Sequence, residues 1–161
     1  DDNASLAILA KFMDISKENY LLANNISVFS LTQIVQKFLP ILNDNSSIVA
    51  LTFTEKVIPS YNIMGVCKSA LNSSIRYLAN DLGEKQIMVN GISSGPVDTS
   101  AASAIEIFPE LLETFGKKSV LKRNITPEEV ANTLLFLLSD LSRGITGQII
   151  NVDAGYSIMG I

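Results

Sequence analysis

Apolar residues recur along this chain with two different spacings, and the spacings predict helices and strands in turn. Between residues 16 and 42, apolar side chains return every three or four positions, which is typical of one face of an α-helix. Ser16 is a suitable N-cap for this helix, and Pro40 and Asn43 mark its end. The apolar face comprises Leu31, Ile34, Val35, Phe38, Leu39 and Leu42. The pattern therefore predicts a long amphipathic helix.

Three short runs are largely apolar, which is typical of strands buried on both faces of a parallel sheet. They are residues 47–53 (SIVALTF), 87–92 and 147–152. A second helix is predicted over residues 61–82, with Gly83 as the left-handed residue after its end. A third helix should start at the capping box Thr126-Pro127-Glu128-Glu129. Residues 97–124 are predicted to be irregular.

This order of elements predicts an α/β protein with right-handed crossovers and a parallel sheet that helices cover on both faces. Three strands make a thin sheet, and strands with two apolar faces need neighbours. The pattern therefore indicates that strands on the amino-terminal side of the sheet are missing. We interpret residues 1–161 as a single domain. Ligands bind such sheets at the carboxyl ends of the strands, which here lead into the loops after Phe53, Ser94 and Val152.

Composition excludes several classes of protein. Of the 161 residues, 47% are hydrophobic and 17% are charged, which excludes a globally disordered chain. No apolar run reaches the roughly 18 residues of a membrane-spanning helix. The net charge of −4 argues against a nucleic-acid partner. With no histidine and a single cysteine, the chain cannot form a histidine-based zinc site, a Ser-His-Asp triad or an intramolecular disulfide, and we predict no metal site.

The first residues give a further expectation about processing and location. The sequence begins at Asp1 rather than methionine, and its amino-terminal segment lacks the charged and apolar regions of a signal peptide. We expect a processed chain or a part of a longer one. We also expect it to be cytoplasmic and to have no membrane partner.

Tyr61 and Lys68 are the residues with the most informative chemistry. They lie seven positions apart, and on a helix this spacing would put both side chains about 20° apart on one face. Gly65 would leave a bare patch of backbone between them, against which a flat ligand could lie. A phenol can donate a proton to a developing oxyanion, and a nearby ammonium group is expected to lower the pKa of that phenol. The alternative is that Tyr61 only caps a helix and Lys68 is solvated.

The surroundings of this pair resemble a known family. Residues 58–83 (IPSYNIMGVCKSALNSSIRYLANDLG) closely resemble the NADH-dependent enoyl-acyl-carrier-protein reductases of the short-chain dehydrogenase/reductase superfamily. These reductases share the six residues between the tyrosine and the lysine, where most of the superfamily has fewer. The resemblance extends from about Lys11 to Tyr156. It implies a Rossmann-like, doubly wound parallel sheet that is partial here, because the Gly-rich turn and the first strands of the family are absent.

The resemblance also implies roles for individual residues. Tyr61 would stabilise the enolate that forms when hydride reaches an enoyl thioester, Lys68 would bind the nicotinamide ribose of NADH, and Phe53 would complete the catalytic group. The implied cofactor-binding residues are Lys68, Gly95, Pro96, Val97, Thr99 and Ala101. The implied substrate-binding residues are Phe53, Tyr61, Met64, Ala101, Ile105 and Phe108, several of them in a substrate-binding loop over about residues 97–124.

The chain departs from the family pattern at several positions. Phe53 stands closest to the family's second tyrosine and lacks its hydroxyl group. Asp98 puts a carboxylate where the cofactor's pyrophosphate would come near, and it should repel that group. Cys67 is expected to be a packed core thiol rather than a nucleophile.

The sequence supports three hypotheses of different strength. The first is an NADH-dependent enoyl-acyl-carrier-protein reductase of fatty acid biosynthesis. It would reduce the trans-2 double bond of an enoyl thioester held by acyl carrier protein and would assemble, by family resemblance, as a homotetramer. The second is a truncated, non-catalytic paralogue that keeps only the oligomer-forming surfaces, which Phe53, Asp98 and the absent Gly-rich turn favour. The third is a related reductase of ketones or alcohols, against which the tyrosine–lysine spacing argues.

Overall fold

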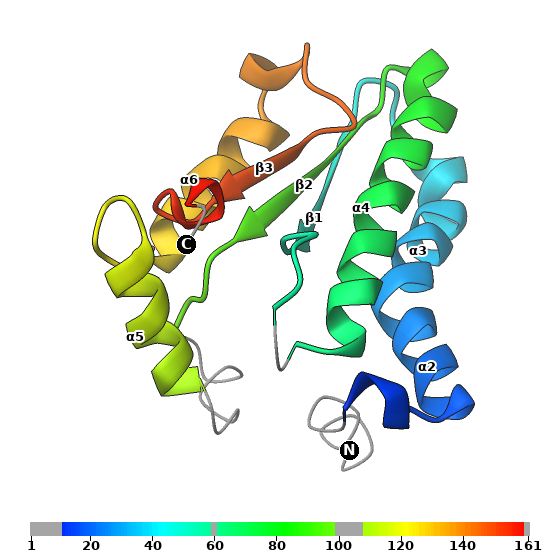
Figure 1. The fold of residues 1–161 in the computed structure, drawn as a ribbon. Helices are drawn as coiled ribbons and strands as arrows, with labels where there is room; N and C mark the ends of the chain where they lie inside the picture. Colours follow the sequence, from blue (N-terminus) through cyan, green and yellow to red (C-terminus); the bar gives the residue numbers. More distant parts are fainter. Residues whose placement is uncertain (1–10, 59–60, 99–107, 160–161) are drawn as a thin grey trace.

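A computed structural model of the chain describes residues 11–58, 61–98 and 108–159. The three strands are β1 (Ser47–Thr52), β2 (Met88–Ser94) and β3 (Ile149–Val152). They pair in parallel in the order β1-β2-β3, with Ser47 opposite Met88 and Gly91 opposite Ile149 (Figure 1). The predicted parallel α/β sheet is therefore confirmed, and all three strands end at the same edge.

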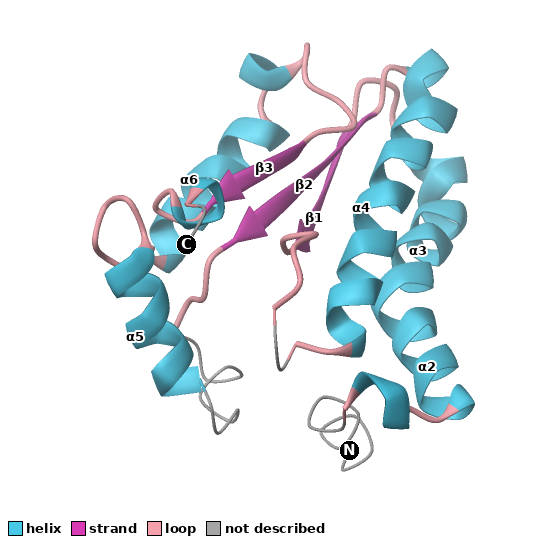
Figure 2. Ribbon diagram, viewed as in Figure 1, coloured by secondary structure: helices cyan, strands magenta, loops and turns pink. Residues whose placement is uncertain are grey.

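Helices cover the sheet on both sides, as predicted (Figure 2). Helices α2 (Lys17–Asn24), α3 (Ser30–Phe38) and α4 (Ile63–Leu82) form one layer, and α6 (Pro127–Leu138) packs against all three strands from the other side. Helix α5 (Phe108–Lys118) lies beyond the carboxyl end of β2. Among the residues described, no helix is both long enough and apolar enough to cross a membrane.

The helix predicted over residues 16–42 forms, but it is not a regular α-helix. A π-helical turn (Asn25–Phe29) joins α2 to α3, and a 3₁₀ turn (Leu39–Ile41) containing Pro40 ends the segment. Ser16 caps it as expected, because its hydroxyl oxygen accepts a hydrogen bond from the backbone N–H of Asn19 at 3.1 Å. The apolar spacing thus predicted the extent of the helix but not the π-helical turn.

The start of α4 differs from the prediction, whereas its end at Leu82 agrees with it. Tyr61 and Asn62 precede the helix as a turn, and Asn62 adopts a positive φ of 51°. Gly83 is right-handed (φ −61°, ψ −36°), so the prediction that it is the left-handed residue is wrong. The chain continues through a 3₁₀ turn (Gly83–Lys85), and Gln86 is the left-handed residue, with φ 55°.

The prediction that residues 97–124 are irregular is wrong for α5. This helix buries Phe108 and Phe115, which lie two turns apart, and pairs Glu113 with Lys117 on its exposed side. The capping box of α6 is confirmed. The Thr126 hydroxyl accepts from the Glu129 N–H at 3.3 Å, and the Glu129 carboxylate accepts from the Thr126 N–H at 2.9 Å.

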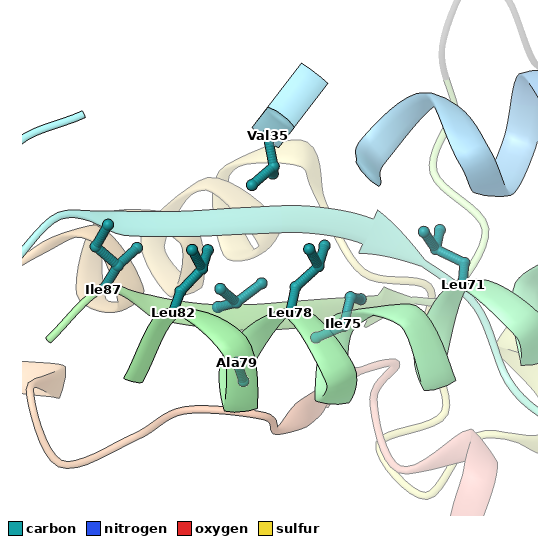
Figure 3. Packing of buried hydrophobic residues seen from close by; sticks show 8 residues of the cluster. Val35, Leu71, Ile75, Leu78, Ala79, Leu82 and Ile87 are labelled. Carbon is teal, nitrogen blue, oxygen red and sulfur yellow. The ribbon is translucent and has the colours of Figure 1, made fainter. Parts of the chain in front are cut away.

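The main core lies between the α3–α4 layer and the sheet. Its buried members are Val35, Leu71, Ile75, Leu78, Ala79, Leu82, Ile87 and Val89 (Figure 3). A smaller cluster holds Ile63 and Cys67 at the start of α4, packed against Ala23 of α2 and Val28 of the π-helical turn. Cys67 is 0% exposed, which confirms the expectation of a packed core thiol.

Two regions leave apolar or hydrogen-bonding groups uncovered. No described strand pairs with the outer edge of β1, where Leu51 is 59% exposed. The α2–α3 segment exposes an apolar face made of Leu21, Leu22, Ile26, Phe29, Ile34 and Phe38. Both features are typical of surfaces that other parts of a larger assembly cover.

Candidate active site

The predicted site residues gather at the carboxyl edge of the sheet. Phe53 directly follows β1, Gly95 follows β2, and Asp153 follows β3. The Gly95 N–H donates to the Val152 carbonyl at 2.9 Å, which holds the second and third loops together. A Cβ atom on Gly95 would lie 3.4 Å from the Cα of Asp153, so the two loops are in van der Waals contact at this position.

Tyr61 is held in the turn that leads into α4. Its N–H donates to the Ile58 carbonyl, and its own carbonyl accepts from the Met64 N–H, both at 3.0 Å. Its ring lies beside Gly65, where an added Cβ would come within 3.9 Å of Tyr61 Cδ1. The phenyl ring of Phe53 meets it edge to face, with centroids 5.2 Å apart. Because Tyr61 precedes the helix, the predicted placement of Tyr61 and Lys68 on one helical face does not describe this geometry.

Burial decides the protonation state of the Tyr61 phenol. Its pKa is raised above 10.0, first by burial and then by the neighbouring Cys67 thiol. The expectation that Lys68 would lower this pKa is therefore wrong, because burial disfavours the charged phenolate and the Lys68 ammonium group is not among the causes of the shift. The phenol stays protonated at neutral pH and is equipped to donate a hydrogen bond.

Lys68 lies on α4 one residue after Cys67 and reaches toward the end of β1. Its Nζ is 3.5 Å from the backbone carbonyl oxygen of Leu51, a long hydrogen bond. Burial lowers the pKa of this amine below 10.5, with the Cys67 thiol opposing the effect. Burial also raises the pKa of the Cys67 thiol. The amine therefore sits at the rim of the sheet, partly removed from water.

The remaining predicted site residues differ in how deeply they are buried. Gly95 is buried, and Pro96 and Val97 are half-buried in the loop after β2. Met64 is half-buried and its sulfur accepts a 3.9 Å hydrogen bond from the Ser27 hydroxyl in the π-helical turn. Phe108 is buried at the start of α5. Thr99, Ala101 and Ile105 lie outside the described residues.

Sequence reasoning missed two features that surround the site. The first is an aromatic cluster: Phe115 lies 6.4 Å from Phe53 and stacks on Tyr156 at 3.7 Å, with ring planes 15° apart. The second is Asn72, a buried amide that is bonded to the end of β1. A polar residue next to the apolar stripe of α4 was the available signal for Asn72. No spacing connects Phe115 with Tyr156, because they come from separate elements.

Fold and site together define a class of protein, a parallel α/β fold with a Tyr-x6-Lys pair at the carboxyl edge of its sheet. The chain belongs to the enoyl-(acyl carrier protein) reductase family, whose sequence model matches residues 2–157. It is similar to the enoyl-[acyl-carrier-protein] reductase [NADH] FabI of Bacillus cereus, with 44% identity over 152 residues. The FabI of Rickettsia typhi is 47% identical over 152 residues. Both alignments cover 93% of this chain.

Solved structures agree with the sequence relatives. The enoyl-(acyl-carrier-protein) reductase of Anaplasma phagocytophilum in complex with NAD superposes with a TM-score of 0.92 at 44% identity, covering 97% of this chain and 60% of that one. The NADH enzyme of Aquifex aeolicus has the same TM-score at 42% identity, covering 97% and 62%. The chain spans 59% and 58% of the Bacillus cereus and Rickettsia typhi sequences. These findings confirm the family and the partial, Rossmann-like sheet.

Proposed function

We propose that the protein containing this chain is an NADH-dependent enoyl-acyl-carrier-protein reductase of fatty acid biosynthesis. It would reduce the trans-2 double bond of an enoyl thioester carried by acyl carrier protein, in the cytoplasm. The observation that carries the proposal is the half-buried Tyr61 phenol, which lies between Phe53 and Gly65 at the carboxyl edge of a parallel sheet, in a chain of this family. The relatives named as NADH enzymes and the neighbour solved with NAD support the choice of cofactor.

Tyr61 and Lys68 have the chemistry for the two central roles. A protonated phenol can donate a hydrogen bond to the thioester oxygen as negative charge develops there, which stabilises the enolate. An ammonium group carries three N–H donors, and the described residues give Lys68 one acceptor, the distant Leu51 carbonyl. The remaining donors suit the ribose hydroxyls of NADH. Bound NADH supplies the hydride, and these side chains hold the ribose and the oxyanion.

The other residues are proposed to shape the cofactor and acyl sites. The backbone at Gly95, Pro96 and Val97 follows β2 at the carboxyl edge, where it would hold the nicotinamide carboxamide. The position of Gly95 supports this role, because its N–H donates to the Val152 carbonyl and ties the loop after β2 to the end of β3. Further residues assigned by family resemblance are Thr99 and Ala101 for the cofactor, and Phe53, Met64, Ala101, Ile105 and Phe108 for the acyl chain. We propose that residues 97–124, including α5, form the substrate-binding loop within a single domain over residues 1–161.

The test is NADH oxidation with a crotonyl thioester, measured on the complete gene product that contains this chain. Tyr61→Phe removes only the hydroxyl and is expected to lower kcat by about 10² to 10⁴-fold, the usual range for losing a positioned proton or hydrogen-bond donor. Tyr77→Phe is the matched control, because Tyr77 lies on α4 and is 74% exposed. The proposal fails if the protein neither binds NADH in calorimetry nor turns over, or if Tyr61→Phe behaves like the control.

We also propose a homo-oligomer, a tetramer by family resemblance. The supporting observation is the exposed apolar face on α2 and α3, which a monomer would leave in water. Ile34→Asp puts a charge on this face and is expected to shift sedimentation toward smaller species. Asn43→Asp adds the same charge at an exposed position beyond the helix and should leave sedimentation unchanged. A monomeric wild-type protein would contradict the proposal.

A further inference from the structure

We propose that Asn72 is a positioning residue for the reductase reaction, because its buried amide fixes the backbone at Phe53 and Phe53 in turn fixes the ring of Tyr61. The inference rests on the proposed function and adds a residue that touches neither cofactor nor substrate. Asn72 lies on the inner side of α4 and is 1% exposed.

The amide of Asn72 forms hydrogen bonds through both its oxygen and its nitrogen to one short segment. The Thr52 hydroxyl donates to Asn72 Oδ1 at 2.5 Å. Asn72 Nδ2 donates to the Phe53 carbonyl at 3.2 Å and to Glu55 Oε1 at 3.4 Å. A side-chain amide has one carbonyl oxygen and two N–H donors, so each group is engaged. All three partners belong to residues 52–55, where β1 ends and the site begins.

The position of this amide makes a purely space-filling role a poor explanation. Asn72 lies beside Leu71 in a helix whose inner face is otherwise almost entirely apolar. A leucine there would fill similar volume and require no partners, whereas a buried amide is stable only when its hydrogen bonds are made. The Glu55 carboxylate also pairs with Arg76 on the next turn, 3.3 Å away. The segment is thus bonded to two successive turns of α4.

The fixed segment controls the surroundings of the Tyr61 ring. Tyr61 lies in the turn before α4, outside the regular helix. The orientation of its ring therefore depends on the residues that contact the ring. One contact is Gly65, and another is Phe53, whose ring lies 5.2 Å from that of Tyr61. Phe115 faces Phe53 at 6.4 Å from α5. Movement of the Phe53 backbone would therefore alter the direction in which the Tyr61 hydroxyl points.

A double-mutant cycle on the complete gene product tests this route. Asn72→Ala is expected to lower kcat about tenfold while the KM for NADH changes much less, because Lys68 is untouched. In a Phe53→Leu background, Asn72→Ala should change kcat much less, since Phe53 carries the effect. Additive effects of the two substitutions would overturn the inference. Asn72→Asp keeps the acceptor for Thr52 and removes both N–H donors. This variant replaces Asn72→Ala in the cycle if Asn72→Ala does not fold.

Asn90→Ala is the matched control for lost stability. Asn90 is also a 1% exposed amide, and it bonds to Ile145 at 2.8 Å and Gln148 at 3.0 Å, on the segment that leads into β3. We expect this variant to lower the melting temperature while kcat stays near the wild-type value. An equal loss of kcat in Asn90→Ala and Asn72→Ala would mean that Asn72 acts only through stability, and the inference would fall.

A second readout needs no activity. The protein is labelled with 3-fluorotyrosine, and the ¹⁹F signal of Tyr61 is assigned by its loss in Tyr61→Phe. Asn72→Ala should shift this signal and Asn90→Ala should not. An unmoved signal overturns the positioning role even in an active enzyme. A shifted signal in a protein that does not oxidise NADH supports the positioning role and contradicts only the proposed reductase function.

Discussion

Gly155 follows β3 in a conformation that a side chain cannot share. Its φ is +81°, and a Cβ atom built there would lie 2.8 Å from both Cβ and Cγ2 of Val120. Gly155→Ala therefore adds left-handed backbone strain of about 1–2 kcal/mol. It also adds overpacking, which costs about 1–3 kcal/mol. The contact cannot be relieved by a rotamer change alone, because Val120 Cβ is attached directly to the backbone. We expect a loss of roughly 2–5 kcal/mol in the free energy of unfolding.

Gly83 provides the control with the opposite sign. It is right-handed, and an added Cβ would meet nothing within 4 Å. Alanine suits this backbone and restricts the unfolded chain, so Gly83→Ala should stabilise the protein by about 0.4–1 kcal/mol. The same variant tests the right-handed conformation of residue 83. If this residue were left-handed, as the sequence predicts, the substitution would destabilise the protein.

Thermal unfolding of the complete gene product measures both variants at one protomer concentration and without NADH, since ligand binding and association shift the midpoint. At about 2–4 °C per kcal/mol for a domain of this size, Gly155→Ala should lower the melting temperature by roughly 4–20 °C. Gly83→Ala should raise it by about 1–4 °C. A Gly155→Ala variant that unfolds within about 1 °C of the wild type would refute the reasoning, as would a Gly83→Ala variant less stable than the wild type.

Three further predictions concern ionisation and burial. Because burial lowers the pKa of Lys68 below 10.5, NADH affinity in calorimetry should fall as the pH rises through a range below that value. Lys68→Arg should remove this dependence, and a flat wild-type profile would contradict the reasoning. Hydrogen bonds from Arg123 and from the Thr126 N–H lower the pKa of Glu129 from 4.5 to about 2. Their contribution to stability is complete above about pH 4.5 and is lost as the pH falls toward 2. Glu129→Gln should reduce this loss of stability at low pH, measured by denaturation across the pH range. An unchanged loss of stability would contradict the role of Glu129. Cys67 should react with a thiol reagent only after unfolding, and rapid labelling of the native protein would show that it is not packed as described.

Local signals predicted much of the fold. The capping box at Thr126 and the continuous apolar runs are statements about neighbouring residues, and the structure confirms both. Gly83 was misplaced because the left-handed position is set by where the chain turns into β2. There, Gln86 donates its N–H to the Gly83 carbonyl. Helix α5 could have been predicted, because Phe108, Leu111, Leu112 and Phe115 follow the i, i+3, i+4, i+7 spacing of an apolar helix face.

The candidate site also combines features that the sequence predicts with features that only the tertiary fold defines. The resemblance of residues 58–83 to a known family singled out Tyr61 and Lys68, because spacing alone left a solvated lysine and a capping tyrosine as an alternative. The direction of the Tyr61 pKa shift could not be predicted from spacing, because it depends on burial by groups such as Phe53. The bonds of Asn72 to residues 52–55 depend on α4 returning to the end of β1, which only the tertiary fold defines.

The π-helical turn at Asn25–Phe29 has a consequence for changes in chain length. A π turn accommodates one residue more than an α-helical turn, so deleting a single residue there would convert the segment to a regular α-helix. The wider π turn takes up its extra residue without a large change in the direction of the flanking helices, so α2 would keep nearly the same orientation relative to α3. Ala23 would then keep its contact with Ile63 and Cys67. Elsewhere in the α2–α3 segment, the loss of one residue would rotate one part of the segment by about 100° relative to the other, so a single deletion is expected to disturb the packing least at Asn25–Phe29.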